Sequence, residues 1–217
     1  MIRFRHVKSS LLVLLTFLLA ACGDGEVRYP LTPGLSATVD INGTRHEMYV
    51  SKVDGRVAHV SFYQQGTLSN HRKYYRGLFV TEAIDKSFHW INDFDPATVE
   101  ALFPLQVGGA VRFETSFRVL NQDVTGKMSV TMSVSGQSDL SVGGVSYPVY
   151  VIEIHQERRL RRGKTISLDR TAYYAPSLGL TLRTVDREGG RTYTTRVVKL
   201  ERPRPPGRRN TLGTMVI

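Results

Sequence analysis

The feature that most constrains the fold of this chain is an alternation of apolar and polar residues, repeated between tight turns. Met128, Val130 and Met132 alternate with serine and threonine, a pattern typical of a strand with one buried and one wet face. Asn42 and Gly43 separate two further runs of this kind, and Asn-Gly is a strong signal for a two-residue hairpin. The chain is therefore expected to form antiparallel strands joined by short turns.

Similar runs continue along most of the chain. The sequence predicts one short helix over 96–102, with Asp95 as its N-cap and Pro96 at the first helical position. Ten or more short strands in one domain predict a mainly β fold, in which a curved antiparallel sheet closes into a partial barrel or sandwich. Strands are expected at 35–41, 44–51, 57–64, 72–76, 78–84, 128–134, 145–155, 165–174, 180–186 and 192–200.

The N-terminus has the pattern of a secretory signal. Arg3, Arg5 and Lys8 precede an apolar run that is too short for a membrane-spanning helix, which needs about 20 apolar residues. The expected organisation is a signal peptide at 1–21, a tether at 22–34, a single β domain at 35–201 and a disordered tail at 202–217. The tail is rich in proline and arginine.

The signal ends in Leu19-Ala20-Ala21-Cys22, which resembles the lipobox of bacterial lipoproteins. The resemblance implies that the Cys22 thiol takes a diacylglyceryl group, that the chain is cut before Cys22, and that the new amine is acylated, for example with palmitate. Because Gly23 rather than Asp follows, it also implies the outer membrane in preference to the inner one, with the domain in the periplasm. The alternative is a plain secreted protein with an incidental cysteine.

Three phrases at 102–108 (LFPLQVG), 142–149 (VGGVSYPV) and 173–180 (YYAPSLGL) resemble, in order and rough spacing, uncharacterised secreted proteins grouped as DUF3108-like. The resemblance covers about residues 100–200 and rests on glycine and proline turns. It departs from that pattern at 110–113, where a tryptophan would be expected. It implies a curved antiparallel sheet in the cell envelope, and it implies no activity.

Positive charge is concentrated near one predicted hairpin. The formal charge of the chain is +10, and charge of this sign beside a lipid anchor would favour anionic lipid, lipopolysaccharide or an envelope protein as partner. Nucleic acid is not expected as a partner outside the cytoplasm. The alternative is solvated charge that maintains solubility. The candidate residues for an anionic partner are Arg158, Arg159, Arg161, Arg162 and Lys164.

A set of aromatic residues is the candidate lining of an apolar cavity in an open barrel. The alternative is that these side chains form the core of the domain. The set is Tyr74, Phe88, Trp90, Phe94 and Phe103.

Catalytic signatures are weak in this sequence. It has no G-x-S-x-G elbow, no H-E-x-x-H helix and no phosphate-binding glycine loop, and Asp93 does not begin a calcium loop, because the twelfth position is Pro104. No cofactor and no metal site are expected. The favoured function is a lipid-anchored, non-enzymatic binding or assembly component facing the periplasm. The alternatives are a carrier of a lipid or other apolar ligand in a half-open β-barrel, and a hydrolase with a dispersed site.

Overall fold

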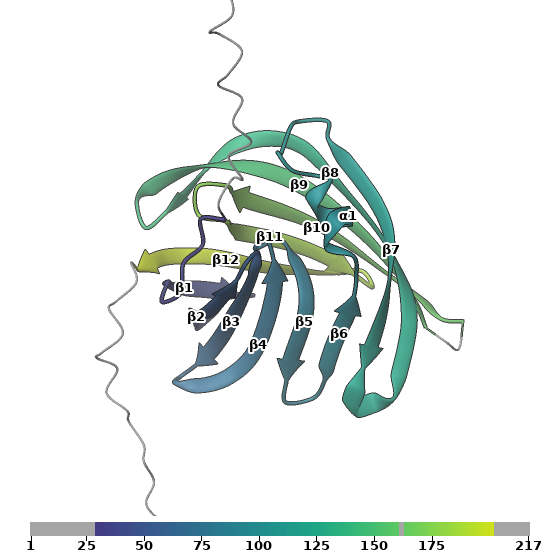
Figure 1. Cartoon of the computed structure of the whole chain (residues 1–217). Coiled ribbons are helices and arrows are strands. Elements are labelled where there is room, and N and C mark those ends of the chain that lie inside the picture. Colours follow the sequence, from purple (N-terminus) through teal and green to yellow (C-terminus); the bar gives the residue numbers. More distant parts are fainter. Residues whose placement is uncertain (1–28, 161–162, 202–217) are drawn as a thin grey trace, which may run out of the picture.

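The structure is a computed structural model that describes residues 29–160 and 163–201. Within these residues, twelve antiparallel strands form one sheet that closes into a barrel (Figure 1). Neighbours in the sheet are neighbours in sequence, and the barrel closes where β1 (Ser36–Ile41) pairs with β12 (Arg191–Glu201). The predicted mainly β, antiparallel fold with one short α-helix is confirmed, and the sheet forms a barrel rather than a sandwich.

The remaining elements follow in order. The first half contains β2 (Thr44–Asp54), β3 (Val57–Gln64), β4 (Thr67–Tyr75), β5 (Phe79–Asp85), β6 (His89–Asp93) and the helix α1 (Pro96–Glu100). The second half contains β7 (Ala110–Val119), the 3-10 helix η1 (Leu120–Gln122), β8 (Val124–Val142), β9 (Val145–Leu160), β10 (Thr165–Ala175) and β11 (Leu180–Glu188).

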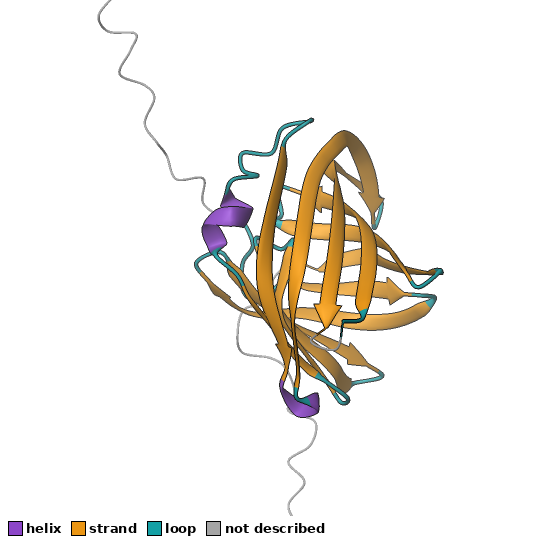
Figure 2. Ribbon diagram, turned by 90° about the vertical axis from the view of Figure 1, so that its right-hand side faces the viewer, coloured by secondary structure: helices purple, strands orange, loops and turns teal. Residues whose placement is uncertain are grey.

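One end of the barrel is closed by α1. Asp95 caps this helix as predicted, since its Oδ1 accepts a hydrogen bond of 2.9 Å from the Ala97 backbone N–H. Glu100, at the other end of the helix, accepts hydrogen bonds from Arg76 Nε at 2.7 Å and from the Tyr75 hydroxyl at 2.8 Å. The helix is therefore tied to the turn between β4 and β5. Figure 2 shows α1 and η1 at opposite ends of the barrel.

The long hairpin of β8 and β9 bends over the same closed end (Figure 1). The register between these strands shifts between Val134 and Gly136, and beyond this bulge Val142 and Val149 are buried. A β-bulge increases the bend of a strand, which lets the hairpin tip at Gly143 approach β12 near Lys199. The hairpin and α1 together cover this end.

The segment predicted as a tether contributes to this covering. Tyr29 and Leu31 are both buried, and the Tyr29 hydroxyl donates a hydrogen bond of 2.9 Å to the Gly179 carbonyl oxygen. Burial raises the pKa of Tyr29. The chain thus reaches the barrel several residues before β1 because two apolar side chains find space among residues of the closed end.

The apolar faces of the strands point into the barrel and form two core clusters. The first lies between β5 and β10 and contains Met128, Val130 and Met132, all with 0% exposure. The second lies between β1–β3 and β10–β12 and includes Val50 and Leu182. No helix among the described residues has the length and apolar character needed to cross a membrane.

Candidate ligand cavities in the open half of the barrel

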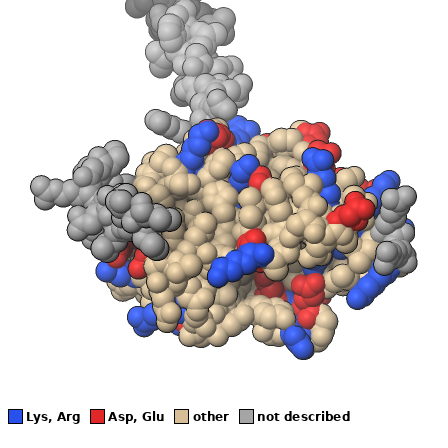
Figure 3. Space-filling view, turned by 90° about the horizontal axis from the view of Figure 1, so that it is seen from below, with Lys and Arg blue, Asp and Glu red and all other residues tan. Residues whose placement is uncertain are grey.

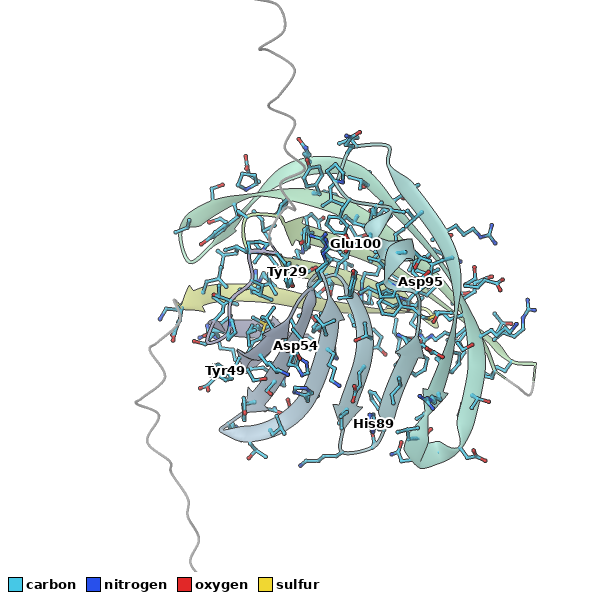
Figure 4. The ribbon with its side chains drawn as sticks, in the orientation of Figure 1. Tyr29, Tyr49, Asp54, His89, Asp95 and Glu100 are labelled. Carbon is cyan, nitrogen blue, oxygen red and sulfur yellow. The ribbon has the colours of Figure 1, made fainter. Side chains whose placement is uncertain are left out.

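The end opposite α1 is lined by polar as well as apolar side chains. Residues directly opposite one another on paired strands share a face of the sheet. Arg72 on β4 lies opposite Val60, which is 1% exposed, and Arg158 on β9 lies opposite Met128. Arginines therefore occupy inward positions in this half. In Figure 4 His89 marks this open end and Glu100 the closed one. Seen from the open end, basic and acidic side chains are scattered over a largely uncharged surface (Figure 3).

The first space in this half is a cavity of about 290 Å³, which we call the Arg72 cavity. Strands β1–β4 and β10–β12 supply its walls. The turn residue Asn42 and the half-exposed Tyr193 belong to its lining, so the cavity reaches the open end, while Gly77 and Leu180 border it on the closed side. Its apolar lining includes Val39, Ile41, Met48, Val60, Phe62 and Leu182.

The second space, the Trp90 cavity, has a volume of about 400 Å³ and lies on the other side of the barrel interior. Trp90 forms one wall and stacks on Phe117 with 4.3 Å between ring centroids. The Arg158 guanidinium lies 5.6 Å from the centre of the Trp90 ring and donates a hydrogen bond of 2.6 Å to Glu188. This arginine therefore already has a carboxylate partner.

Arg170 lines both cavities and separates them. Its Nε and Nη2 atoms donate to the two carboxylate oxygens of Asp186 at 2.7 and 2.6 Å, a bidentate geometry. Burial alone would lower the pKa of Arg170, but the hydrogen bonds to Asp186 and the charge of its carboxylate outweigh burial and raise it. The pair is a fixed, neutralised partition inside the barrel.

Arg72 is placed differently. Its Nη1 donates to the Tyr74 hydroxyl at 3.3 Å, and its guanidinium lies 5.6 Å from the centre of the Phe62 ring. Among the described residues, no carboxylate lies within ion-pair distance of Arg72. The side-chain oxygen of Asn70, which lines the same cavity, is buried and has no hydrogen-bond partner among the described residues. The cavity thus contains polar groups with unused bonding capacity.

The five aromatic residues predicted to line one cavity are divided among three places. Tyr74 lines the Arg72 cavity, while Phe88 and Trp90 line the Trp90 cavity. Phe94 and Phe103 instead pack against the first core cluster near the closed end, where Phe94 contacts the rings of Tyr75 and Phe79.

The predicted basic site is also divided. Arg158 points into the barrel, whereas its neighbour Arg159 lies opposite Lys127 on the outer face and is exposed, as is Lys164. Successive residues of a strand point to opposite faces, so the two arginines serve different surfaces. Arg161 and Arg162 lie outside the described residues.

Groups with hydrolytic chemistry lie elsewhere. The Ser61 hydroxyl is 3.1 Å from His71 Nδ1, but both residues are on the outer face of the barrel and line neither cavity. Burial lowers the pKa of His71. The described residues contain no group of three or more His, Cys, Asp or Glu placed to hold a metal ion.

Sequence reasoning did not single out Arg72 and Arg170. Each is an arginine in phase with buried or inward residues of its own strand, Arg72 with Tyr74 and Arg170 with Ala172. These positions could have been recognised from the sequence, because a charged residue on the apolar face of a strand indicates either a buried ion pair or a binding site.

The architecture is thus a closed, twelve-stranded antiparallel barrel that is filled at one end and hollow at the other. Two solved structures have a similar overall fold. The hypothetical lipoprotein YmcC from Escherichia coli K12 superposes with a TM-score of 0.55 at 13% identity, covering 92% of this chain and 100% of that chain. A Bacteroides fragilis protein described as exported and as having a YmcC-like fold gives a TM-score of 0.50 at 10% identity, covering 81% and 99%.

At these identities the likeness concerns the fold. No family model and no curated protein matches this sequence. The resemblance to DUF3108-like proteins therefore stays a prediction.

Proposed function

We propose that this chain is a lipid-anchored envelope protein that binds a small ligand of mixed polar and apolar character inside its barrel, without catalysing a reaction. The observation that carries this proposal is the hollow open half, in which two cavities of about 290 and 400 Å³ adjoin one partition. Ligand cavities in proteins typically measure about 300–1,000 Å³ and combine apolar walls with a few polar groups. Both spaces have that composition.

The envelope location is supported by two separate observations. Cys22, outside the described residues, ends a lipobox-like sequence, and the solved proteins of similar fold are described as a lipoprotein and an exported protein. Two or three long acyl chains would anchor the protein firmly, since each buried CH₂ contributes about 0.8 kcal/mol. We place the protein at the periplasmic face of the outer membrane.

The first test identifies what the barrel holds. Protein purified from native membranes is examined by mass spectrometry under non-denaturing conditions, with Thr195→Phe as the blocked variant, because Thr195 lines the Arg72 cavity. Thr194→Phe is the matched control, since Thr194 is the adjacent residue and points to the other face. We expect a bound small molecule in the wild type and in Thr194→Phe, and a reduced amount in Thr195→Phe. No bound molecule in the wild type would contradict the proposal, and equal amounts in all three proteins would exclude the Arg72 cavity as the binding site.

The second test concerns the anchor. Cells are labelled with a lipid precursor, and label is expected in the wild-type protein and not in Cys22→Ala. Wild-type protein without label would exclude a lipid anchor, and the binding function would then belong to a plain secreted protein.

A further inference from the structure

The lining of the Arg72 cavity carries more positive than negative charge. Its charged residues are three arginines, Arg72, Arg170 and Arg183, and one carboxylate, Asp186. Arg183 lies opposite Tyr173 with its guanidinium over that ring, out of phase with the inward Leu182. Asp186 already accepts hydrogen bonds from the Nε and Nη2 atoms of Arg170. The cavity therefore has no carboxylate left for Arg72 among the residues that line it.

Asp85, an acidic residue outside this lining, is already engaged by other donors. The positive charge of Arg72 helps to lower the pKa of Asp85, but the two side chains form no ion pair. The Asp85 Oδ1 instead accepts hydrogen bonds from the Ser87 backbone N–H, the Ser87 hydroxyl and the Phe88 backbone N–H, at 2.6, 2.8 and 2.9 Å. Arg72 is left with one long hydrogen bond to Tyr74 and an aromatic ring. Because Arg72 is only partly buried, an anion that enters the cavity can reach the guanidinium N–H groups that these contacts leave unused.

The rest of the cavity suits an alkyl chain. Val39, Met48, Val60 and Leu182 lie in its walls and carry no polar side-chain atom that a ligand would have to satisfy. The volume of about 290 Å³ is at the lower limit for ligand cavities, so a molecule with one chain fits better than one with two. Tyr193, which is 40% exposed at the open end, provides an apolar entrance.

We infer that the Arg72 cavity binds a single-chain anionic amphiphile, with its carboxylate or phosphate group on the Arg72 guanidinium and its alkyl chain along the apolar wall. The planar guanidinium matches both kinds of headgroup, because two of its N–H groups can donate in parallel to two oxygens. This inference rests on the proposed binding function and names the ligand class.

Isothermal titration calorimetry of the full chain, purified in amphipol, tests the inference with decanoate, decyl phosphate and decan-1-ol. Arg72→Met removes the charge and keeps a side chain over Phe62. Lys73→Met is the control, because it removes one positive charge from the next residue, which points outward and pairs with Glu82. We expect the dissociation constant of decanoate or decyl phosphate to rise about tenfold or more in Arg72→Met and to be unchanged in Lys73→Met. The tighter binder of the two identifies the headgroup.

The neutral alcohol separates the two proposals. Wild-type protein that binds decan-1-ol as tightly as both anions, with no effect of Arg72→Met, would overturn the headgroup inference and leave the binding function intact. Wild-type protein that binds none of the three would also overturn the inference, whereas the binding function itself is contradicted only if the protein from native membranes carries no small molecule.

A second measurement needs no variant. Phenylglyoxal modifies accessible arginines, and the modified sites are located by peptide mass spectrometry. Decanoate or decyl phosphate is expected to protect Arg72 in wild-type protein, while decan-1-ol is not. Equal modification of Arg72 with and without the anions would overturn the inference even if Arg72→Met failed to fold.

Discussion

Glu100 stabilises the closed end of the barrel because three side chains bind its carboxylate. These are Arg76, which is buried, together with Tyr75 and Arg56, the last at 2.8 Å. In Glu100→Gln, the Arg76 guanidinium stays buried without its counter-charge, which we expect to cost about 3 kcal/mol of unfolding free energy. Urea unfolding measures this loss, and Glu114→Gln, an exposed position on β7, serves as control. A loss no larger than that of the control would show that the ion pair contributes little.

The same residue predicts a pH dependence. Burial alone would raise the pKa of Glu100, but hydrogen bonds from Arg76 and Tyr75 outweigh it and hold the pKa below its ordinary value of 4.5. The stabilisation by Glu100 is therefore complete above pH 4.5 and is lost as the pH falls through the lower folded-state pKa. The difference in unfolding free energy between wild type and Glu100→Gln should be constant at neutral pH and shrink in acid. A difference that stayed level down to about pH 2 would contradict this assignment.

Gly77 is required where two turns of the closed end meet. Its φ is +65°, and a Cβ at this position would overlap the backbone carbonyl oxygen of Gly179. Gly55 has a similar φ of +55° but open space around it. Alanine at either site incurs the left-handed backbone cost of about 1–2 kcal/mol, and only Gly77→Ala adds a steric cost of about 1–3 kcal/mol. Thermal unfolding of the two variants should show the larger loss for Gly77→Ala. Equal losses would mean that the turns can separate freely.

At this scale the sequence supports some assignments and not others. Asp95 could be predicted as a helix cap because its partner is two residues away, within reach of local rules. Arg72 and Asn70 could not be assigned to a cavity, because the facing walls come from β1 and β2, which precede them, and from β10–β12, far along the chain. Local alternation predicts the face of the sheet on which a residue lies. It does not predict which side chains face that residue across the barrel.

The helix α1 is the element whose stability depends most on one residue. It has five residues, too few to be stable in isolation, and Asp95 supplies its side-chain cap. Asp95→Ala should lower the unfolding free energy by about 1 kcal/mol, whereas Asp95→Asn, which can still accept the hydrogen bond, should have a much smaller effect. Chemical denaturation of both variants checks this. Similar losses in the two variants would mean that the negative charge, and not the hydrogen bond, matters.

The strands themselves were predictable where hairpin turns and alternation coincide, as for β2 and β3 around Asp54 and Gly55. The predicted strand at 72–76 was too short, because β4 begins at Thr67 directly after the turn at Gly66. The residues from Ser69 to Lys73 are all polar, so they show no apolar–polar alternation, because the inward positions of β4 are occupied by Asn70 and Arg72. The polar side chains that line the cavity therefore also hid the first half of this strand from a prediction based on alternation.

Closure of the barrel is a property of the whole molecule that no local pattern contains. It depends on pairing between β1 and β12, for example Ala37 opposite Leu200, across almost the full described chain. Whether the interior is filled or hollow depends further on which end receives α1 and the β8–β9 hairpin. The sequence allowed both a barrel and a sandwich for this reason, and the hollow half became visible only with all strands in place.

The position of the chain entry predicts how the barrel faces the membrane. Tyr29 is held at the closed end by Gly179, and the seven residues from Cys22 can reach at most about 25 Å. A lipid on Cys22 would therefore keep the closed end near the bilayer and direct the cavities away from it. Because Cys22 is the sole cysteine and its thiol would be blocked, spin labels can be attached at Val107→Cys near the closed end and at Leu120→Cys at the open end.

Both positions are exposed, at 59% and 51%, so labelling should leave the packing intact. In nanodiscs with a paramagnetic chelator on the lipid headgroups, the label at position 107 should relax faster than the label at position 120. The difference should vanish when the anchor is removed by Cys22→Ala. Faster relaxation at position 120 would mean that the open end faces the membrane, in which case ligands would enter the cavities directly from the lipid surface rather than from the aqueous side.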